Sequence, residues 1–189
     1  MRACSLALML MAAPVTADGV LDYENAYEAC ALCHGLFGDS RRAKFPKLAG
    51  QDPVYLEAQI LAFLSGQRRN DGGQMVAVVT ELDAADIPVV VDWFATQDPP
   101  TPAPPPQGEE GALLYILGEC GSCHDSRTGV PLLTAQHPAY LAKQMRDFRA
   151  GLRPVSTRAK TAAMMALSEA EIDTLAAWLG AQPREPHDG

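Results

Sequence analysis

The spacing of apolar residues along the chain predicts helices. Asp52 and Pro53 form a helix start, because a capping carboxylate followed by proline at the first helical position commonly begins a helix. The predicted helix ends near Gly66. Its apolar face consists of Tyr55, Leu56, Ile60, Phe63 and Leu64. A second helix is predicted from Asp83, with this apolar face: Ile87, Val90, Val91 and Phe94. A shorter one is predicted over 21–30, and Pro88 is expected to bend the second helix.

The same pattern returns 85 residues further along the chain. The matched identities include Pro46/Pro131, Leu48/Leu133, Gln51/Gln136, Pro53/Pro138, Tyr55/Tyr140, Leu56/Leu141, Gln59/Gln144, Phe63/Phe148, Gly66/Gly151, Arg68/Arg153, Leu82/Leu167, Ile87/Ile172 and Trp93/Trp178. Ser168 and Glu171 form a capping-box pattern at the start of the last helix. So many identities in one register indicate a tandem duplication. We therefore predict an all-α protein of two tandem domains that share one fold.

The chain divides into five predicted segments: 1–17, an export signal; 18–97, the first domain; 98–107, a proline-rich linker; 108–182, the second domain; and 183–189, a tail expected to fray. The signal has Arg2, a short apolar run and small residues before Asp18. The run is too short to span a bilayer, so we expect periplasmic export, with a buried first helix or an uncleaved anchor as alternatives. Six of the eight residues over 99–106 are proline, which favours an extended strut of roughly 25 Å.

The net charge of −8 argues against nucleic acid or an anionic membrane as a partner. An acidic chain suits docking to a basic surface instead. Aromatic residues make up 6% of the chain, so two small domains would have thin cores unless a large apolar cofactor added buried area.

Two pentapeptides carry the candidate chemistry: Cys30-Ala31-Leu32-Cys33-His34 and Cys120-Gly121-Ser122-Cys123-His124. Cys-x-x-Cys-His is the pattern for covalent attachment of c-type haem, in which two thiols bind the porphyrin and the histidine binds its iron. A zinc site would need four ligands in one cluster. Cys4 lies in the predicted leader, so no cysteine remains for a structural disulfide. The sequence thus predicts two covalently bound haem c groups.

The sixth iron ligand differs between the halves. Met75 follows the Gly66 loop and precedes a helix, which favours it as the ligand opposite His34 over a role in the core. In strict register the second half places Lys160 at this position. Met164 is the first candidate there, and the alternatives are Met165, a neutral Lys160 amine or an open iron. Met145 is expected in the core.

Other polar and aromatic residues are weaker candidates. Arg68 and Arg153 could bind haem propionates, or pair with solvent or carboxylates. His137 is expected to be a capping or surface residue, and His187 has no assigned role. The remaining expectations place aromatic residues beside the haems, in the pockets or under the last helix of each half: Tyr55, Tyr140, Phe63, Phe148, Trp93 and Trp178.

Together the motifs resemble the cytochrome c4 family: Cys-x-x-Cys-His-Gly, Phe-Pro-Lys-Leu-Ala-Gly-Gln, Tyr-Leu, a Gly-x-Arg loop and a Leu-Asp/Ser-x-x-Asp/Glu-Ile helix. The resemblance covers about residues 22 to 180. It implies two cytochrome c folds related by a pseudo-two-fold axis, His–Met ligation, and electron transfer between redox proteins, for example towards a terminal oxidase. It implies a carrier and not an enzyme. The second half departs at Asp125, at Leu133-Thr134-Ala135, at its shorter loop after the haem motif and at Lys160.

Two alternatives remain open. The chain could be the electron-accepting subunit of a periplasmic dehydrogenase that oxidises sulfur compounds or alcohols, and so be associated with a membrane through its partner. It could also be a haem enzyme or gas sensor with an open second iron.

Overall fold

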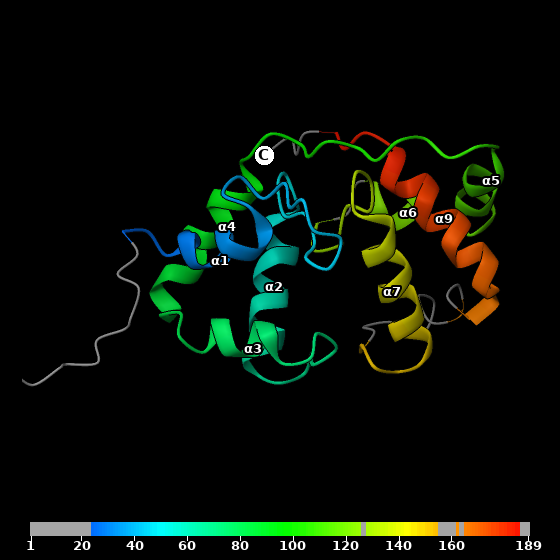
Figure 1. Ribbon diagram of the computed structural model, residues 1–189. Coiled ribbons are helices and arrows are strands. Elements are labelled where there is room, and N and C mark those ends of the chain that lie inside the picture. The colour runs from blue at the N-terminus through cyan, green and yellow to red at the C-terminus, as the bar shows by residue number, and fades with distance from the viewer. Residues whose placement is uncertain (1–23, 126–127, 155–161, 163–164, 186–189) are drawn as a thin grey trace, which may run out of the picture.

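The computed structural model describes residues 24–125, 128–154, 162 and 165–185. Its described residues form helices and no strand, and they gather into two helical bodies side by side (Figure 1). The first body contains α1 (Tyr27–His34), α2 (Pro53–Leu64), α3 (Gln74–Val79), the 3-10 turn η1 (Ala84–Asp86) and α4 (Ile87–Ala95). The second contains α5 (Glu110–Leu117), α6 (Gly121–His124), α7 (Pro138–Arg149) and α9 (Glu169–Ala181). The all-α prediction is confirmed.

The first body is built on the packing of α2 against α4. Asp52 caps α2, with its carboxylate accepting a hydrogen bond of 2.7 Å from the Tyr55 amide, as its sequence predicts. The core consists of Leu56 from α2 and the predicted apolar face of α4: Ile87, Val90, Val91 and Phe94. The helix predicted from Asp83 is divided, because η1 precedes α4. Pro88 therefore lies in the first turn of α4 and not inside the helix as expected, and its missing N–H costs nothing there.

The second body packs α9 against both α7 and α5. Its core contains Leu141, Ala142, Met145, Ile172, Leu175, Ala176 and Leu179, so Met145 is a core residue as expected. The capping box of Ser168 and Glu171 is present in full. Gly111 on α5 lies so close to α9 that an added Cβ would be 2.2 Å from the Cβ of Trp178. Glycine is therefore required at this helix crossing.

Two glutamines join the bodies through reciprocal backbone contacts. The Gln51 side chain donates to the Leu132 carbonyl at 2.9 Å and accepts from the Leu132 amide at 2.8 Å. The Gln136 side chain does the same with Lys47, at 2.9 and 2.8 Å. Lys47 matches Leu132 and Gln51 matches Gln136 in the repeat, so the two pairs are related as a pseudo-two-fold axis requires.

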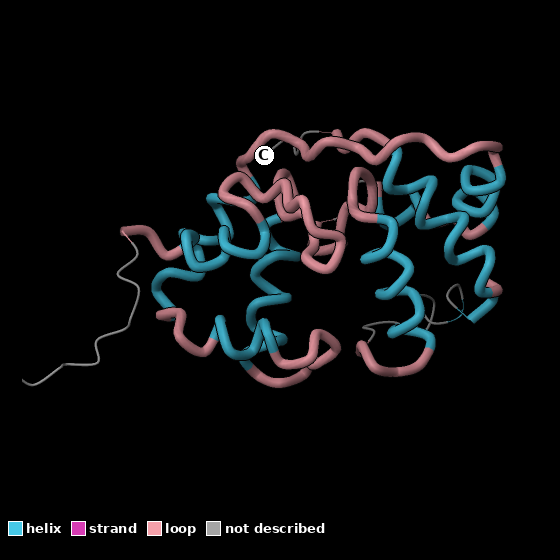
Figure 2. The backbone as a smooth tube through the Cα atoms, viewed as in Figure 1, coloured by secondary structure: helices cyan, strands magenta, loops and turns pink. Residues whose placement is uncertain are grey.

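Two further segments fasten the bodies together. The linker runs along both of them as an extended loop (Figure 2), with the Ala103 amide bound to the Gly180 carbonyl at 2.8 Å. After α9, the Arg184 side chain is only 3% exposed and donates to the carbonyls of Ala49 (2.6 Å) and Thr134 (2.9 Å). The expected fraying of the tail is thus wrong at Arg184, and burial lowers the pKa of its guanidinium to about 10.

Candidate haem attachment sites

In the first half, α1 carries both thiols and the histidine of the motif. His34 is buried, and its Nδ1 lies 2.8 Å from the Pro46 carbonyl oxygen. A carbonyl only accepts, so Nδ1 holds the proton and the Nε2 lone pair is left for a metal. Burial lowers the pKa of His34, against the opposing effect of the Pro46 carbonyl, and this favours the neutral imidazole that binds iron.

In the second half, the same geometry is reached by a shorter loop. His124 Nδ1 lies 2.8 Å from the Pro131 carbonyl oxygen, seven residues away, whereas His34 and Pro46 are twelve apart. The motif is also carried differently, since α5 ends at Leu117 and His124 lies on the separate short helix α6. Both histidines are therefore oriented by the carbonyl of the equivalent proline.

The cysteines suit thioether attachment. None of the four motif cysteines is paired in a disulfide: Cys30, Cys33, Cys120 and Cys123. Burial raises the pKa of Cys30 to about 11, with a further contribution from Cys33, and burial also raises the pKa of Cys120. In the part of the chain that the structure describes, no group of three or more His, Cys, Asp or Glu side chains could hold a metal ion. The donor set thus fits two haem c groups, each with one histidine ligand, and not a zinc cluster.

The candidate sixth ligands are placed only in part. Met75 is half-buried at the start of α3, where its backbone amide donates to the Asp71 carboxylate. Met165 is 59% exposed. Met164 and Lys160 lie outside the described residues. The ligand roles of these four residues remain predictions.

Asp125 shows how the second motif departs from the first. Gly35, which follows the first motif, has a φ of +82°, a conformation that an aspartate would adopt only with strain. Asp125 instead has a φ of −92° and accepts a hydrogen bond from the Tyr115 hydroxyl. The carboxylate and burial raise the pKa of Tyr115, with burial the larger cause. The substitution is therefore accommodated by a different backbone path, and it ties α6 to α5.

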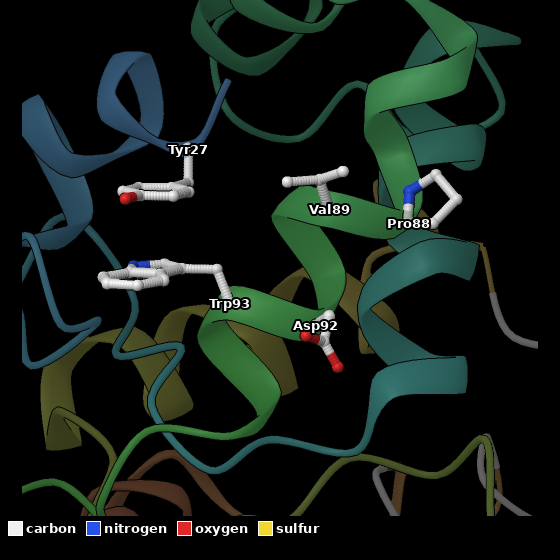
Figure 3. Close-up of a pocket in the computed structure, with 5 residues that line it drawn as sticks. All are labelled: Tyr27, Pro88, Val89, Asp92 and Trp93. Carbon is white, nitrogen blue, oxygen red and sulfur yellow. The ribbon is translucent and has the colours of Figure 1, made fainter. Parts of the chain in front are cut away.

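Trp93 fastens α4 to the first haem motif. Its ring stacks on Tyr27 of α1, with centroids 3.9 Å apart and planes at 4° (Figure 3). Its Nε1 donates to the Leu36 carbonyl at 2.7 Å. In the second half, Trp178 packs against Tyr115 of α5, with ring centroids 5.2 Å apart. Each tryptophan thus joins the last helix of its half to the helix that leads into the haem motif.

The two arginines matched by the repeat lie between the bodies. Arg68 donates to Gln59 (2.8 Å) in its own half and to Tyr140 (3.1 Å) and Gln144 (3.2 Å) in the other. Its guanidinium also lies over the Phe63 ring, 4.6 Å from the centroid. Arg68 therefore crosses the interface, and it binds side chains of both halves.

Arg153 repeats this arrangement from the opposite side. It donates to Gln144 (2.7 Å) in its own half and to Tyr55 (2.8 Å) and Gln59 (3.0 Å) in the other, and it lies over the Phe148 ring. Burial would raise the pKa of Tyr55, but the two neighbouring guanidiniums lower it overall. These contacts place the hydroxyls of Tyr55 and Tyr140 in the interface. Their expected place beside the haems stays a prediction.

His137 also crosses the interface. It precedes α7 but makes no side-chain capping bond; its Nε2 lies 2.8 Å from the Ser40 carbonyl of the first half. The expected capping role is therefore wrong. No local pattern in the sequence signals this contact, because it depends on how the two bodies meet. His187 lies outside the described residues.

In the part of the chain that the structure describes, no helix has the length and apolarity needed to cross a membrane.

Comparison with known proteins agrees with this geometry. No family model matches the chain. The chain is 35% identical to cytochrome c4 of Pseudomonas aeruginosa over 66% of this chain and 68% of that protein. It is 32% identical to cytochrome c4 of Thiocapsa roseopersicina over 75% and 80% of the two chains. It is also 31% identical to a thiosulfate dehydrogenase electron acceptor of Thiomonas intermedia, over 84% and 80%.

Among solved structures, the chain is similar to cytochrome c4 of Acidithiobacillus ferrooxidans, with a TM-score of 0.71 and 26% identity. That match covers 82% of this chain and 99% of the other.

Proposed function

Because the chain belongs to the cytochrome c4 family, we propose that it works in the periplasm, passing electrons between soluble or membrane-bound redox proteins. It is a dihaem c-type cytochrome and an electron carrier, and it is not itself an enzyme. The observation that carries the proposal is the equivalent orientation of His34 and His124, each held by a proline carbonyl at 2.8 Å. These equivalent contacts orient both imidazole rings through Nδ1 in the same way.

We assign the attachment residues half by half. Cys30, Cys33 and His34 hold the first haem, and Cys120, Cys123 and His124 hold the second. Each bound haem supplies one-electron chemistry between Fe(III) and Fe(II). The protein binds and orients it, and the proton on each histidine Nδ1 stays on the hydrogen bond to the proline carbonyl.

The sixth ligands complete the assignment: Met75 for the first iron and Met164 for the second, with Lys160 and Met165 as alternatives. A methionine opposite histidine raises the reduction potential, which suits a carrier that accepts electrons from dehydrogenases.

Near-infrared magnetic circular dichroism of the oxidised holoprotein tests the ligands. We expect two His–Met charge-transfer bands, of which Met75→Ala removes one and Met164→Ala the other. Met165→Ala and Lys160→Ala serve as matched controls and leave both bands. A His–amine band lost in Lys160→Ala would move the second ligand to Lys160. A high-spin second iron would overturn the simple carrier in favour of small-ligand chemistry at that haem.

The location has its own test. Mass spectrometry of the holoprotein from a periplasmic extract should give a chain that begins at Asp18 and carries two haem masses. Recovery of the chain in the cytoplasm without haem would contradict export.

A second candidate role is electron acceptor for a thiosulfate-oxidising dehydrogenase. The likeness to the Thiomonas intermedia protein supports it. So does a thiosulfate dehydrogenase structure from Marichromatium purpuratum, which the chain matches with a TM-score of 0.69 and 28% identity over 82% of this chain and 36% of that one. Reduction of the holoprotein by a purified thiosulfate dehydrogenase with thiosulfate, and not by thiosulfate alone, would support this role.

A further inference from the structure

A group of cations lies beside the first haem motif of this acidic chain. Arg41, Arg42 and Lys44 fall in the loop between His34 and Pro46, which is five residues longer than the loop between His124 and Pro131. All three side chains are exposed. Within the described ranges, none of them forms an ion pair, whereas Lys47 nearby is paired with Asp39 at 3.0 Å. We call Arg41, Arg42 and Lys44 the basic cluster.

Two residues of the basic cluster, Arg41 and Arg42, line a hollow that reaches the haem motif. The hollow has a volume of about 790 Å³, and Cys33, Arg41, Arg42 and Lys47 are among the residues that line it. Its apolar rim includes Leu36 and Phe37, which is 59% exposed. Exposed aromatic and aliphatic side chains ringed by charge are typical of surfaces that bind another protein.

The loop that carries the basic cluster is held in place. Ser40 Oγ donates to the Cys33 carbonyl at 3.2 Å and accepts from the Arg42 amide at 3.2 Å. His137 of the second half binds the Ser40 carbonyl, and the Thr101 amide of the linker donates to Asp39 at 3.1 Å. The arginines therefore extend from a loop fastened to α1, the linker and the second body.

Among the described residues next to the second motif, no cluster of exposed cations matches the basic cluster. Glu119 and Asp125 flank Cys120–His124, and both are exposed. The described residues beside the two haem motifs thus differ in charge: exposed cations lie beside the first and exposed carboxylates beside the second. The net charge of −8 suits a basic partner over most of the surface, and the basic cluster is a local exception to it.

We propose that the basic cluster and its apolar rim dock the acidic face of a redox protein beside the first haem. This inference rests on the proposed carrier function and names the partner by its chemistry, a carboxylate-rich surface around a redox cofactor. Arginine suits this task because its planar donors bind carboxylates in a bidentate manner. It also makes the first half, and not the second, the side that such a partner uses.

The test measures binding of a flavodoxin, used as an acidic redox protein, to the full-length holoprotein. Titration calorimetry is carried out at ionic strengths of about 0.01 M and about 0.15 M, where the Debye lengths are roughly 30 and 8 Å. Arg41→Glu and Arg42→Glu are each expected to raise the dissociation constant about fivefold at low salt, with a smaller loss of affinity at high salt. In the wild type, added flavodoxin should shift backbone amide resonances over 36–47.

Arg69→Glu is the matched control, because Arg69 is an exposed arginine of the same half and the variant changes the net charge equally. It should bind flavodoxin within about twofold of the wild type. Equal loss in Arg69→Glu, wild-type binding in Arg42→Glu, or resonance shifts confined to α5 and α6 would each overturn the proposal. Failure of the carrier function itself would look different: the wild-type haems would not cycle reversibly with dithionite and hexacyanoferrate.

Discussion

Arg68 and Tyr140 lie in different halves of the molecule, and the Arg68 guanidinium donates to the Tyr140 hydroxyl at 3.1 Å. The repeat-related pair, Arg153 and Tyr55, makes the same bond at 2.8 Å. Duplication has thus produced an interface in which two equivalent arginine–tyrosine hydrogen bonds join the two domains. Arg68 and Arg153 therefore stabilise the association of the two domains.

Replacing Arg153 by leucine should destabilise the holoprotein by about 2–4 kcal/mol, because its loss removes donors from the Tyr55 hydroxyl and Gln59 while leaving those groups in the interface. Arg153 is 7% exposed, so water cannot readily replace it. Guanidinium-induced unfolding followed by far-ultraviolet circular dichroism measures the change. Arg69→Leu, at an exposed arginine of the same chain, should cost less than about 0.5 kcal/mol. Equal losses would contradict a special role for the interface.

Local sequence predicted what depends on local structure. The caps at Asp52 and Ser168 and the apolar face that includes Phe94 are set by residues within a few positions of one another. Capping motifs located the caps, and periodicity located the apolar face. The attachment chemistry was predictable for the same reason, because five consecutive residues make up each haem motif.

Contacts between the halves could not be predicted in this way. The repeat matches Arg68 with Arg153, but which side either arginine turns to depends on how two finished domains dock. The buried contacts of Arg184 were harder still to predict, because the repeat matches Arg184 with Pro99 and offers no equivalent arginine in the first half. The repeat does hold one clue to backbone strain: Ala135 stands where the first half has Gly50, at a position that needs a left-handed backbone.

Gln136→Ala should loosen one specific backbone contact between the halves. It removes the acceptor of the Lys47 amide and the donor to the Lys47 carbonyl, both of which are buried, so we expect a loss of about 2–3 kcal/mol. Amide hydrogen exchange should become faster at Lys47 and change less at Leu132, which Gln51 holds. Gln51→Ala should give the opposite pattern. Uniform acceleration in both variants would mean that the contacts open only with global unfolding.

Gly50→Ala and Ala135→Gly should change the stability of the protein by different amounts. Both positions have positive φ, at +59° and +52°. Gly50→Ala adds the left-handed strain and a Cβ only 3.3 Å from the Gln97 carbonyl, so it should cost about 1–2 kcal/mol. Ala135→Gly relieves the strain but loses a fully buried methyl group, so it should lie within about 0.5 kcal/mol of the wild type. Thermal unfolding of both variants measures this, and a strongly destabilised Ala135→Gly would show that the alanine is not strained.

His137 should make the joined domains less stable in mild acid. Burial lowers the pKa of this imidazole and Lys47 lowers it further, while the Ser40 carbonyl and Asp39 act in the opposite direction. The unfolded chain then takes up a proton near pH 6.5 that the folded protein takes up only at lower pH. The contribution of the neutral His137 ring to the free energy of unfolding is therefore complete above about pH 6.5. It is lost as the pH falls towards the lowered pKa.

His137→Gln isolates this effect, since the glutamine amide can still donate to the Ser40 carbonyl but does not titrate. The free energy of unfolding, measured between about pH 7.5 and 5, should fall more steeply in the wild type than in the variant. Carboxylates titrate in both proteins and cancel in the difference. Parallel curves would show that His137 keeps an ordinary pKa, and a steeper fall in the variant would show that the protonated ring stabilises the interface through Asp39.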